Sequence, residues 1–269
     1  MRYFVHIAYN GLVYNGWQKQ PGLTSVQAVL EKTLSDVFKM PVAIIGCGRT
    51  DTRVHASQFF FHMDIEQEWD FDLVFRMNKL LPHNIAVFDI IQVEAHRHAR
   101  FDAVLRSYDY FLHTYKDPFL SNLSSFYLLD KLDFDKMKQA VALLPQYRDY
   151  RPFCTSPDKY EHTRCKVMAA SLYVNERGDK LRFQISANRF LSRMIRIIMG
   201  QLLRIGKGEQ SVDEFENYLI EKRTPEMLNP AHPQGLYLSK VSYPYLNLSP
   251  KPEFSPILRN EAELSWHQL

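Results

Sequence analysis

The chain has 269 residues, of which 46% are hydrophobic and 23% charged, and its formal net charge is +3. This composition is that of an ordinary folded protein and excludes a disordered chain. The small positive charge permits an anionic partner without indicating one, so the placement of the basic residues has to decide whether such a partner is expected. The three cysteines form no C-x-x-C pair, and no apolar run reaches the ~18 residues of a membrane span. We therefore expect a cytoplasmic protein without a membrane segment, a metal site or a disulfide framework.

The first half of the chain alternates strand-like and helical patterns. In chain order these patterns predict a strand at 3–9, a helix at 24–38, an apolar run at 42–45, a strand at 58–65, a helix near 71–80 and strands near 85–93 and 106–114. Thr24 and Gln27 have the spacing of a capping box, which places the start of the first helix.

The second half repeats this plan loosely. The patterns predict a helix at 133–144, a hairpin formed by "CKVMAASLYV" and "KLRFQISA", a helix at 189–204, a helix near 211–222 and a last strand, "GLYLSKVSY". We expect an α+β fold with a mostly antiparallel sheet, built as two similar α/β lobes. The predicted organisation is an N-terminal lobe over 1–115, a C-terminal lobe over 116–244 and a surface tail over 245–269.

A single carboxylate lies among bases in the stretch "GCGRTDTRVHA", residues 46–56. Asp51 stands between Arg49 and Arg53, with His55 beyond them. An acid between two arginines is most often a helix cap or a surface ion pair worth ~0–1 kcal/mol. The two glycines before it, however, favour a backbone that something else approaches closely.

The rest of the chain places arginines beside aromatic residues, a pairing that suits phosphate contact and base stacking. Each instance alone is more typical of a solvated face or of core packing. Together with the Asp51 loop they favour a nucleic-acid site. One face of the helix predicted at 189–204 carries Arg189, Arg193 and Arg196. One face of the strand predicted at 106–114 carries Arg106, Tyr108 and Tyr110.

Several motifs occur in the order and spacing of one known family. They are "YNGLVYNGWQKQ" (9–20), "GCGRTD" with "VHA" (46–56), "LLPHNIAV" (80–87), "HARFDAVLRSYDY" (98–110), "FLSRMIRIIMG" (190–200) and "GLYL" (235–238). Over residues 3–244 the chain resembles the TruA family of tRNA pseudouridine synthases.

The resemblance implies a function and a set of site residues. The family isomerises uridine to pseudouridine at nucleotides 38, 39 and 40 of the tRNA anticodon stem-loop, as a homodimer without metal or cofactor. Its fold is two lobes with RRM-like sheets joined around a basic central cleft. Asp51 matches the catalytic aspartate, Tyr108 the tyrosine that stacks on the uracil, Arg196 the arginine that pairs with the aspartate, and Arg49 the arginine that displaces the target base.

On this basis we expect catalytic roles for Asp51, Tyr108 and Arg196. The expected substrate contacts are Arg49, Thr50, Arg53, His55, Arg106, Tyr110 and Arg193.

Departures from the family pattern also carry information. Arg53 stands where the family has glycine, and if that position requires a positive φ, a side chain there costs ~1–2 kcal/mol. Our hypothesis is that Arg53 contacts phosphate or the extruded nucleotide. Ser107 and Asp109 replace bases around Tyr108, and Asn10 replaces an aspartate, so the RNA footprint can differ.

Four other interpretations stay open from the sequence. A catalytically impaired family member would act as an RNA-binding protein. A phosphate hydrolase could use the glycine loop, although the G-K-[ST] ending of a P-loop is missing. A metal enzyme could use His96 and His98, which have no matching second pair. Cys47 could be a thiol nucleophile, but no clear activating base is near it in sequence.

Overall fold

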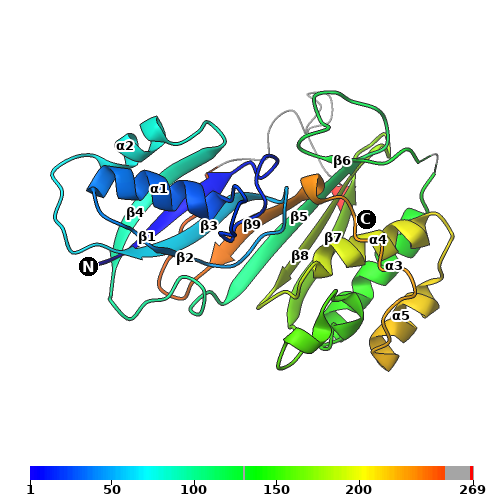
Figure 1. The fold of residues 1–269 in the computed structure, drawn as a ribbon. Coiled ribbons are helices and arrows are strands. Elements are labelled where there is room, and N and C mark those ends of the chain that lie inside the picture. The colour runs from blue at the N-terminus through cyan, green and yellow to red at the C-terminus, as the bar shows by residue number, and fades with distance from the viewer. Residues whose placement is uncertain (130, 252–266, 269) are drawn as a thin grey trace. The chain divides into compact units, whose positions relative to one another are not determined.

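The computed structural model describes residues 1–129, 131–251 and 267–268. They form two compact units. Unit 1 comprises Met1–Arg106 and the segment that begins at Tyr237, and unit 2 comprises Ser107–Leu236 together with the last strand. The chain leaves unit 1 within strand β5 and returns to it at the start of strand β9 (Figure 1). Of the surface tail predicted over 245–269, residues 252–266 and 269 lie outside the described residues.

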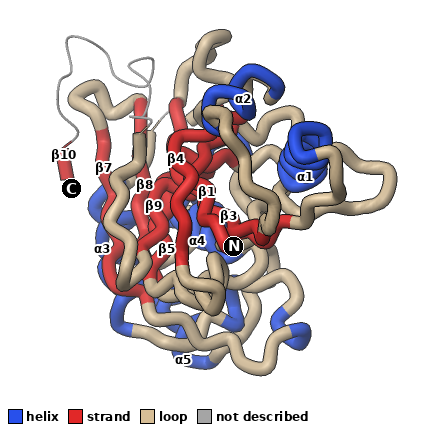
Figure 2. Tube along the Cα trace, turned by 90° about the vertical axis from the view of Figure 1, so that its left-hand side faces the viewer, coloured by secondary structure: helices blue, strands red, loops and turns tan. Residues whose placement is uncertain are grey.

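Unit 1 is a mostly antiparallel sheet with two helices. Its elements are β1 (Arg2–Tyr9), α1 (Val26–Phe38), β2 (Ile44–Gly46), β3 (His55–Asp64), α2 (Leu73–Leu80), β4 (Ile85–Val93) and β9 (Leu236–Ser242). Strand β1 pairs antiparallel with β3 and β4, and β2 pairs antiparallel with β3. Strand β9 is parallel to β3. Helix α2 packs on β4, and α1 contacts α2 and β2 (Figure 2).

Strand β1, predicted at 3–9, spans Arg2–Tyr9 and is buried on both of its faces. The helices cover one side. On the other side the chain beyond β9 returns over the sheet, where the rings of Tyr243 and Tyr245 lie 5.3 Å and 6.2 Å from the ring of Phe4. The polar His6 is fully buried under this cover. Its burial is tolerated because its Nδ1 pairs with Asp89 at 2.8 Å.

The start of α1 differs from the predicted capping box by one residue. Ser25 is the N-cap, and its hydroxyl accepts a hydrogen bond from the Ala28 amide at 3.2 Å. Thr24 instead uses its carbonyl to accept the Asn15 amide. The sequence carries two adjacent residues that can cap a helix, and the contact with the preceding loop selects the second.

Unit 2 combines paired strands with three helices. Its elements are β5 (Leu105–His113), β6 (Ser125–Phe126), α3 (Phe134–Leu143), β7 (Val167–Val174), β8 (Lys180–Ala187), α4 (Met194–Gly206), α5 (Val212–Glu221) and β10 (His267–Gln268), with 3-10 turns at Leu144–Gln146, Arg151–Phe153, Pro157–Lys159 and Pro233–Gly235. The strand order is β10-β7-β8-β5, with β6 parallel to the end of β5. The predicted hairpin of β7 and β8 is confirmed, and α3 packs on β7, α4 and α5.

Helix α4 begins five residues later than the predicted helix at 189–204, so the predicted basic stripe is wrong. Arg193 is the N-cap and has a left-handed backbone with φ 57°. Because this conformation breaks the helical path, Arg189 and Arg193 precede the helix and share no face with Arg196. Nearly every residue of α4 is buried, which makes it the central helix of unit 2.

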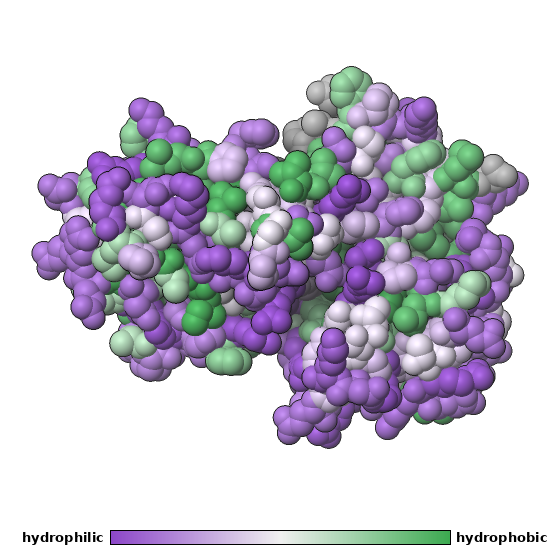
Figure 3. All heavy atoms as spheres, viewed as in Figure 1, coloured by the Kyte–Doolittle hydropathy of each residue, from purple (hydrophilic) through white to green (hydrophobic). Residues whose placement is uncertain are grey.

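The structure thus confirms a mixed α/β fold with mostly antiparallel strands. On the face shown in Figure 3, hydrophilic residues cover most of each unit and apolar side chains are scattered among them. Across the described residues, every helix is too short or too polar to cross a membrane.

Candidate active site

The Asp51 loop begins where β2 ends, at Gly46. A side chain at Gly46 would meet the indole of Trp17 at 2.6 Å, so only glycine lets the strand pass this ring. Trp17 is itself fixed by stacking on Phe59 of β3, with ring centroids 4.0 Å apart. The start of the loop is therefore held by an aromatic core.

The opening motif "YNGLVYNGW" forms the other support of this loop. The Trp17 amide donates to the Thr50 carbonyl at 3.2 Å, and the Arg53 amide donates to the Tyr14 carbonyl at 3.1 Å. A Cβ at Gly16, whose φ is +81°, would lie 2.4 Å from the Thr50 carbonyl oxygen. The two motifs are thus packed backbone to backbone, which gives a physical reason for their joint occurrence.

On this fixed backbone, Asp51 lies in sequence between two exposed cationic side chains. Its side chain is half-buried, while Arg49 and Arg53 are exposed. Among the described residues, neither arginine side chain makes an ion pair or hydrogen bond. The Asp51 carbonyl accepts the Val54 amide at 3.1 Å, which closes a turn. Within this turn Arg53 has φ 63°, so the position does require the left-handed conformation that glycine adopts without strain.

Thr50 and His55, two of the expected substrate contacts, use their polar atoms inside unit 1. The Thr50 hydroxyl lies 2.8 Å from the hydroxyl of Tyr9. Nδ1 of His55 accepts the Gly11 amide at 3.1 Å, and the imidazole stacks on Tyr237 with centroids 4.6 Å apart. These contacts hold Thr50 and His55 in place and so support the Asp51 loop.

Arg106, another expected substrate contact, binds backbone oxygens of its own unit. Its Nη2 donates to the carbonyls of Cys47 at 2.7 Å and Arg100 at 2.8 Å. Its Nε donates to Cys47 at 3.3 Å, and its Nη1 donates to Ala103 at 3.2 Å. This guanidinium therefore joins the start of the Asp51 loop to the segment before β5.

In unit 2, β5 carries the two tyrosines that the sequence singled out. Tyr108 is 8% exposed, and its ring meets Phe190 edge to face at 5.1 Å. Tyr110 is 1% exposed, and its hydroxyl oxygen lies 2.8 Å from the Ser125 hydroxyl and 2.9 Å from the His232 carbonyl oxygen. Burial raises the pKa of Tyr110 well above its usual value. Tyr110 thus packs in the core of its unit.

Two of the departures around Tyr108 are also explained by contacts within unit 2. Asp109 is 1% exposed and accepts from Nε of Arg182 at 2.6 Å and from Gln184 at 3.1 Å. The Ser107 hydroxyl lies 2.7 Å from that of Ser186. Both side chains face the neighbouring strand β8, which accounts for their identity without reference to RNA.

Arg196 projects from the first turn of α4 and is half-buried. Its Nε donates to the Ala231 carbonyl at 2.7 Å, and the Ala231 amide donates to its carbonyl at 2.8 Å. The chain around Ala231 lies against α4 because Gly200 leaves room for it: a Cβ there would be 2.1 Å from the Asn229 carbonyl. Arg193 is exposed at the start of the helix.

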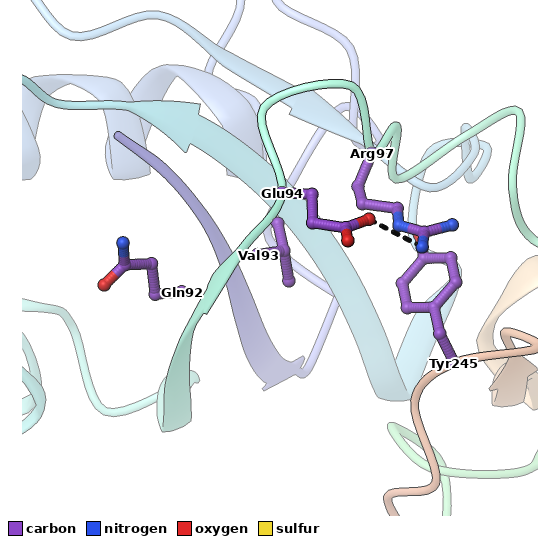
Figure 4. Close-up of a pocket in the computed structure, with 5 residues that line it drawn as sticks. All are labelled: Gln92, Val93, Glu94, Arg97 and Tyr245. Carbon is purple, nitrogen blue, oxygen red and sulfur yellow. Dashed lines mark ion pairs between the residues drawn. The ribbon is translucent and has the colours of Figure 1, made fainter.

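An open hollow of about 610 Å³ in unit 1 contains none of the expected site residues (Figure 4). Arg97 lies over the Tyr245 ring at 4.1 Å and is ion-paired with Glu94 at 2.7 Å, so its charge is already engaged.

The described residues include no cluster of three or more metal-ligating side chains. Burial raises the pKa of Cys47 to about 11, which keeps the thiol protonated at neutral pH.

Sequence reasoning missed the supporting residues of the Asp51 loop, above all Gly16 and Trp17. Both lie in the motif at 9–20, but a pattern of glycines and aromatics does not say which other segment it packs against. The left-handed backbone at Arg53 was suggested only by the glycine that related sequences have there.

Comparisons with known proteins find relatives along most of the chain. A sequence model described as tRNA pseudouridine synthase matches residues 147–244. The tRNA pseudouridine synthase A of Porphyromonas gingivalis is 37% identical over 246 residues, which cover 90% of this chain and 97% of that protein. Those of Parabacteroides distasonis and Bacteroides fragilis are each 38% identical, over 90% of this chain and 96% of their own length. The chain therefore belongs to the tRNA pseudouridine synthase A family.

Proposed function

We propose that this enzyme isomerises uridine to pseudouridine at nucleotides 38, 39 and 40 of the tRNA anticodon stem-loop, in the cytoplasm and as a homodimer. The observation that carries the proposal is the Asp51 loop, where a carboxylate on a backbone fixed from two sides stands between two exposed guanidiniums. The flanking charges suit a polyanionic substrate. The target nucleotides and the dimeric state are proposed from family membership.

The reaction requires access to an atom inside a stacked stem. The target base must leave the stack, at a cost of a few kcal/mol. We assign Arg49 to the vacated space and Tyr108 to the extruded uracil, and ring stacking of this kind is worth roughly 1–3 kcal/mol. Arg53 and Arg193, both exposed, are assigned to phosphate contacts. Tyr110, Thr50 and His55 are left with supporting roles because their polar atoms are engaged.

The isomerisation breaks the bond between ribose C1′ and uracil N1 and forms a bond between C1′ and C5. The proton on C5 is lost and N1 gains one, so the reaction needs no cofactor. A carboxylate can act as the nucleophile or base that these steps require and can later be released. We propose that Asp51 takes this role and that Arg196 is the arginine that pairs with the catalytic aspartate in this family.

The test is pseudouridine formation on anticodon stem-loop RNA by the unmodified protein and by Asp51→Asn. Asparagine keeps the shape of the side chain and removes its charge. We expect RNA affinity within tenfold of the original and turnover reduced by at least 10³-fold, the scale of losing a nucleophile rather than a contact. Arg164→Gln, an exposed arginine of unit 2, is the matched control and should keep full turnover.

Two other outcomes would separate the alternatives. Tight RNA binding without turnover in the unmodified protein would identify an RNA-binding protein, the role of a catalytically impaired family member. Equal turnover in the original and in Asp51→Asn would show that the carboxylate is architectural.

A further inference from the structure

We propose that Arg106 is a positioning residue, which fixes the start of the Asp51 loop through its guanidinium and does not contact RNA. This inference rests on the proposed function, because its consequence is read as turnover. It replaces the substrate contact that the sequence suggested for this arginine. The basis is the set of backbone carbonyls that the guanidinium binds.

The Cys47 peptide is the point at which the loop is held. Its amide donates to the Phe60 carbonyl of β3 at 2.7 Å, the last such bond before the chain leaves the sheet. Its carbonyl accepts both Nε and Nη2 of Arg106, at 3.3 Å and 2.7 Å. Cys47 is fully buried. The paired strands end at Gly46, so this carbonyl has no strand partner, and a buried carbonyl requires a donor from elsewhere.

The shape of the arginine head matters as much as its charge. A planar guanidinium offers donors in several fixed directions, whereas a lysine ammonium is a compact point charge on a flexible stem. Arg106 uses these directions to reach Cys47 and, on the other side, the carbonyls of Arg100 and Ala103. A side chain at Gly48 would lie 3.9 Å from Nε, so the loop passes close to the guanidinium.

The chain between Cys47 and Asp51 is only three residues long. Loss of the Arg106 contact would leave the Cys47 peptide held by its amide bond to Phe60 and by the packing of Gly46 on Trp17, while the second half of the loop stays fixed by the bonds of Thr50 and Arg53. Displacing a catalytic group by about 1 Å can reduce turnover by about 100-fold. Arg106 should therefore influence the chemical step and leave RNA affinity unchanged.

Four measurements on Arg106→Lys and Arg106→Gln test this role, with Arg100→Ala as the matched control. Arg100 is an exposed neighbour, and the alanine variant keeps the carbonyl that Arg106 binds. For both Arg106 variants we expect single-turnover rates at least 30-fold lower, RNA Kd within threefold and an unchanged dependence of Kd on salt. Amide exchange at Cys47, whose amide donates to the Phe60 carbonyl, should be at least tenfold faster. The control should keep its rate and its exchange.

A phosphate contact would give the opposite pattern. Arg106→Gln would then reduce the slope of log K against log salt by about 0.7–0.9, and Arg106→Lys would restore it. That result, or loss of cooperative unfolding in both variants, would overturn the proposal. If the unmodified protein forms no pseudouridine, the proposed function fails, whereas the exchange and salt measurements still decide whether Arg106 holds the loop.

Discussion

Replacing Arg53 by glycine should separate the strain in the Asp51 loop from its charge. The backbone at Arg53 has φ 63°, and a side chain in this conformation costs roughly 1–2 kcal/mol. Glycine removes that strain but adds about 0.5–1 kcal/mol of chain entropy to the unfolded state. We expect a net gain of about 0.5–1 kcal/mol in the free energy of unfolding, seen as a melting temperature about 1–4 °C higher.

The same change should weaken RNA binding. The guanidinium is exposed and, among the described residues, has no ion pair, so its removal takes away no support from the fold. Loss of one phosphate contact reduces the salt slope by about 0.7–0.9, which corresponds to a five- to tenfold higher Kd near 0.1 M salt. The assay is binding of anticodon stem-loop RNA across a salt series.

Two matched variants make the interpretation unambiguous. Arg53→Asn removes the charge but tolerates the left-handed backbone, so it should lose the same affinity with a smaller gain in stability. Arg53→Lys keeps the charge and should keep the slope. An unchanged slope in the glycine and asparagine variants would refute the phosphate contact, and a lower melting temperature for Arg53→Gly would refute the assigned strain.

Further predictions concern the support of the loop and the buried titratable groups. Gly16→Ala should destabilise the protein by about 2 kcal/mol or more and abolish turnover, because its Cβ would meet the Thr50 carbonyl. Gly22 has φ +72° and open space around it, so Gly22→Ala should cost only about 1 kcal/mol, as measured by thermal unfolding. Burial lowers the pKa of His62 from 6.5 to about 4, so the unfolded state takes up the proton first, and the stability that His62 contributes above pH 6.5 should be lost as the pH falls towards 4. Melting temperatures of the original and of His62→Gln across this pH range should converge at low pH; parallel curves would contradict the assignment. Cys47→Ala should keep turnover within about threefold, and a complete loss would instead support a thiol nucleophile.

The periodic patterns of the sequence predicted most elements correctly, because both units have ordinary amphipathic helices and strands. The hairpin of β7 and β8 and the helix α2 were confirmed within a few residues. The helix predicted at 189–204 failed at its start, since the apolar spacing continues through residues that are not helical. No Ser, Thr or Asp marks the true N-cap; the left-handed Arg193 does, and a sequence does not show a backbone angle.

The contacts that support the candidate site were less accessible to sequence reasoning. Asp51 stood out because a lone carboxylate among bases is unusual. The roles of Gly16 and Arg106 depend on which distant backbone each one meets, and such pairings follow from the folded chain only. Tyr110 illustrates the same limit: its spacing from Tyr108 puts it on the same side of β5 but does not show that its hydroxyl meets Ser125 and the His232 carbonyl.

Unit 1 is assembled from two pieces of chain separated by the whole of unit 2, and this has a consequence for biosynthesis. Tyr237, which stacks on His55, and Leu238, which pairs with Ala56, are translated about 130 residues after the first piece ends. A ribosome-bound nascent chain that stops short of Tyr237 would hold the Asp51 loop without this neighbour. Enzymatic competence should therefore arise abruptly, only once β9 has left the exit tunnel.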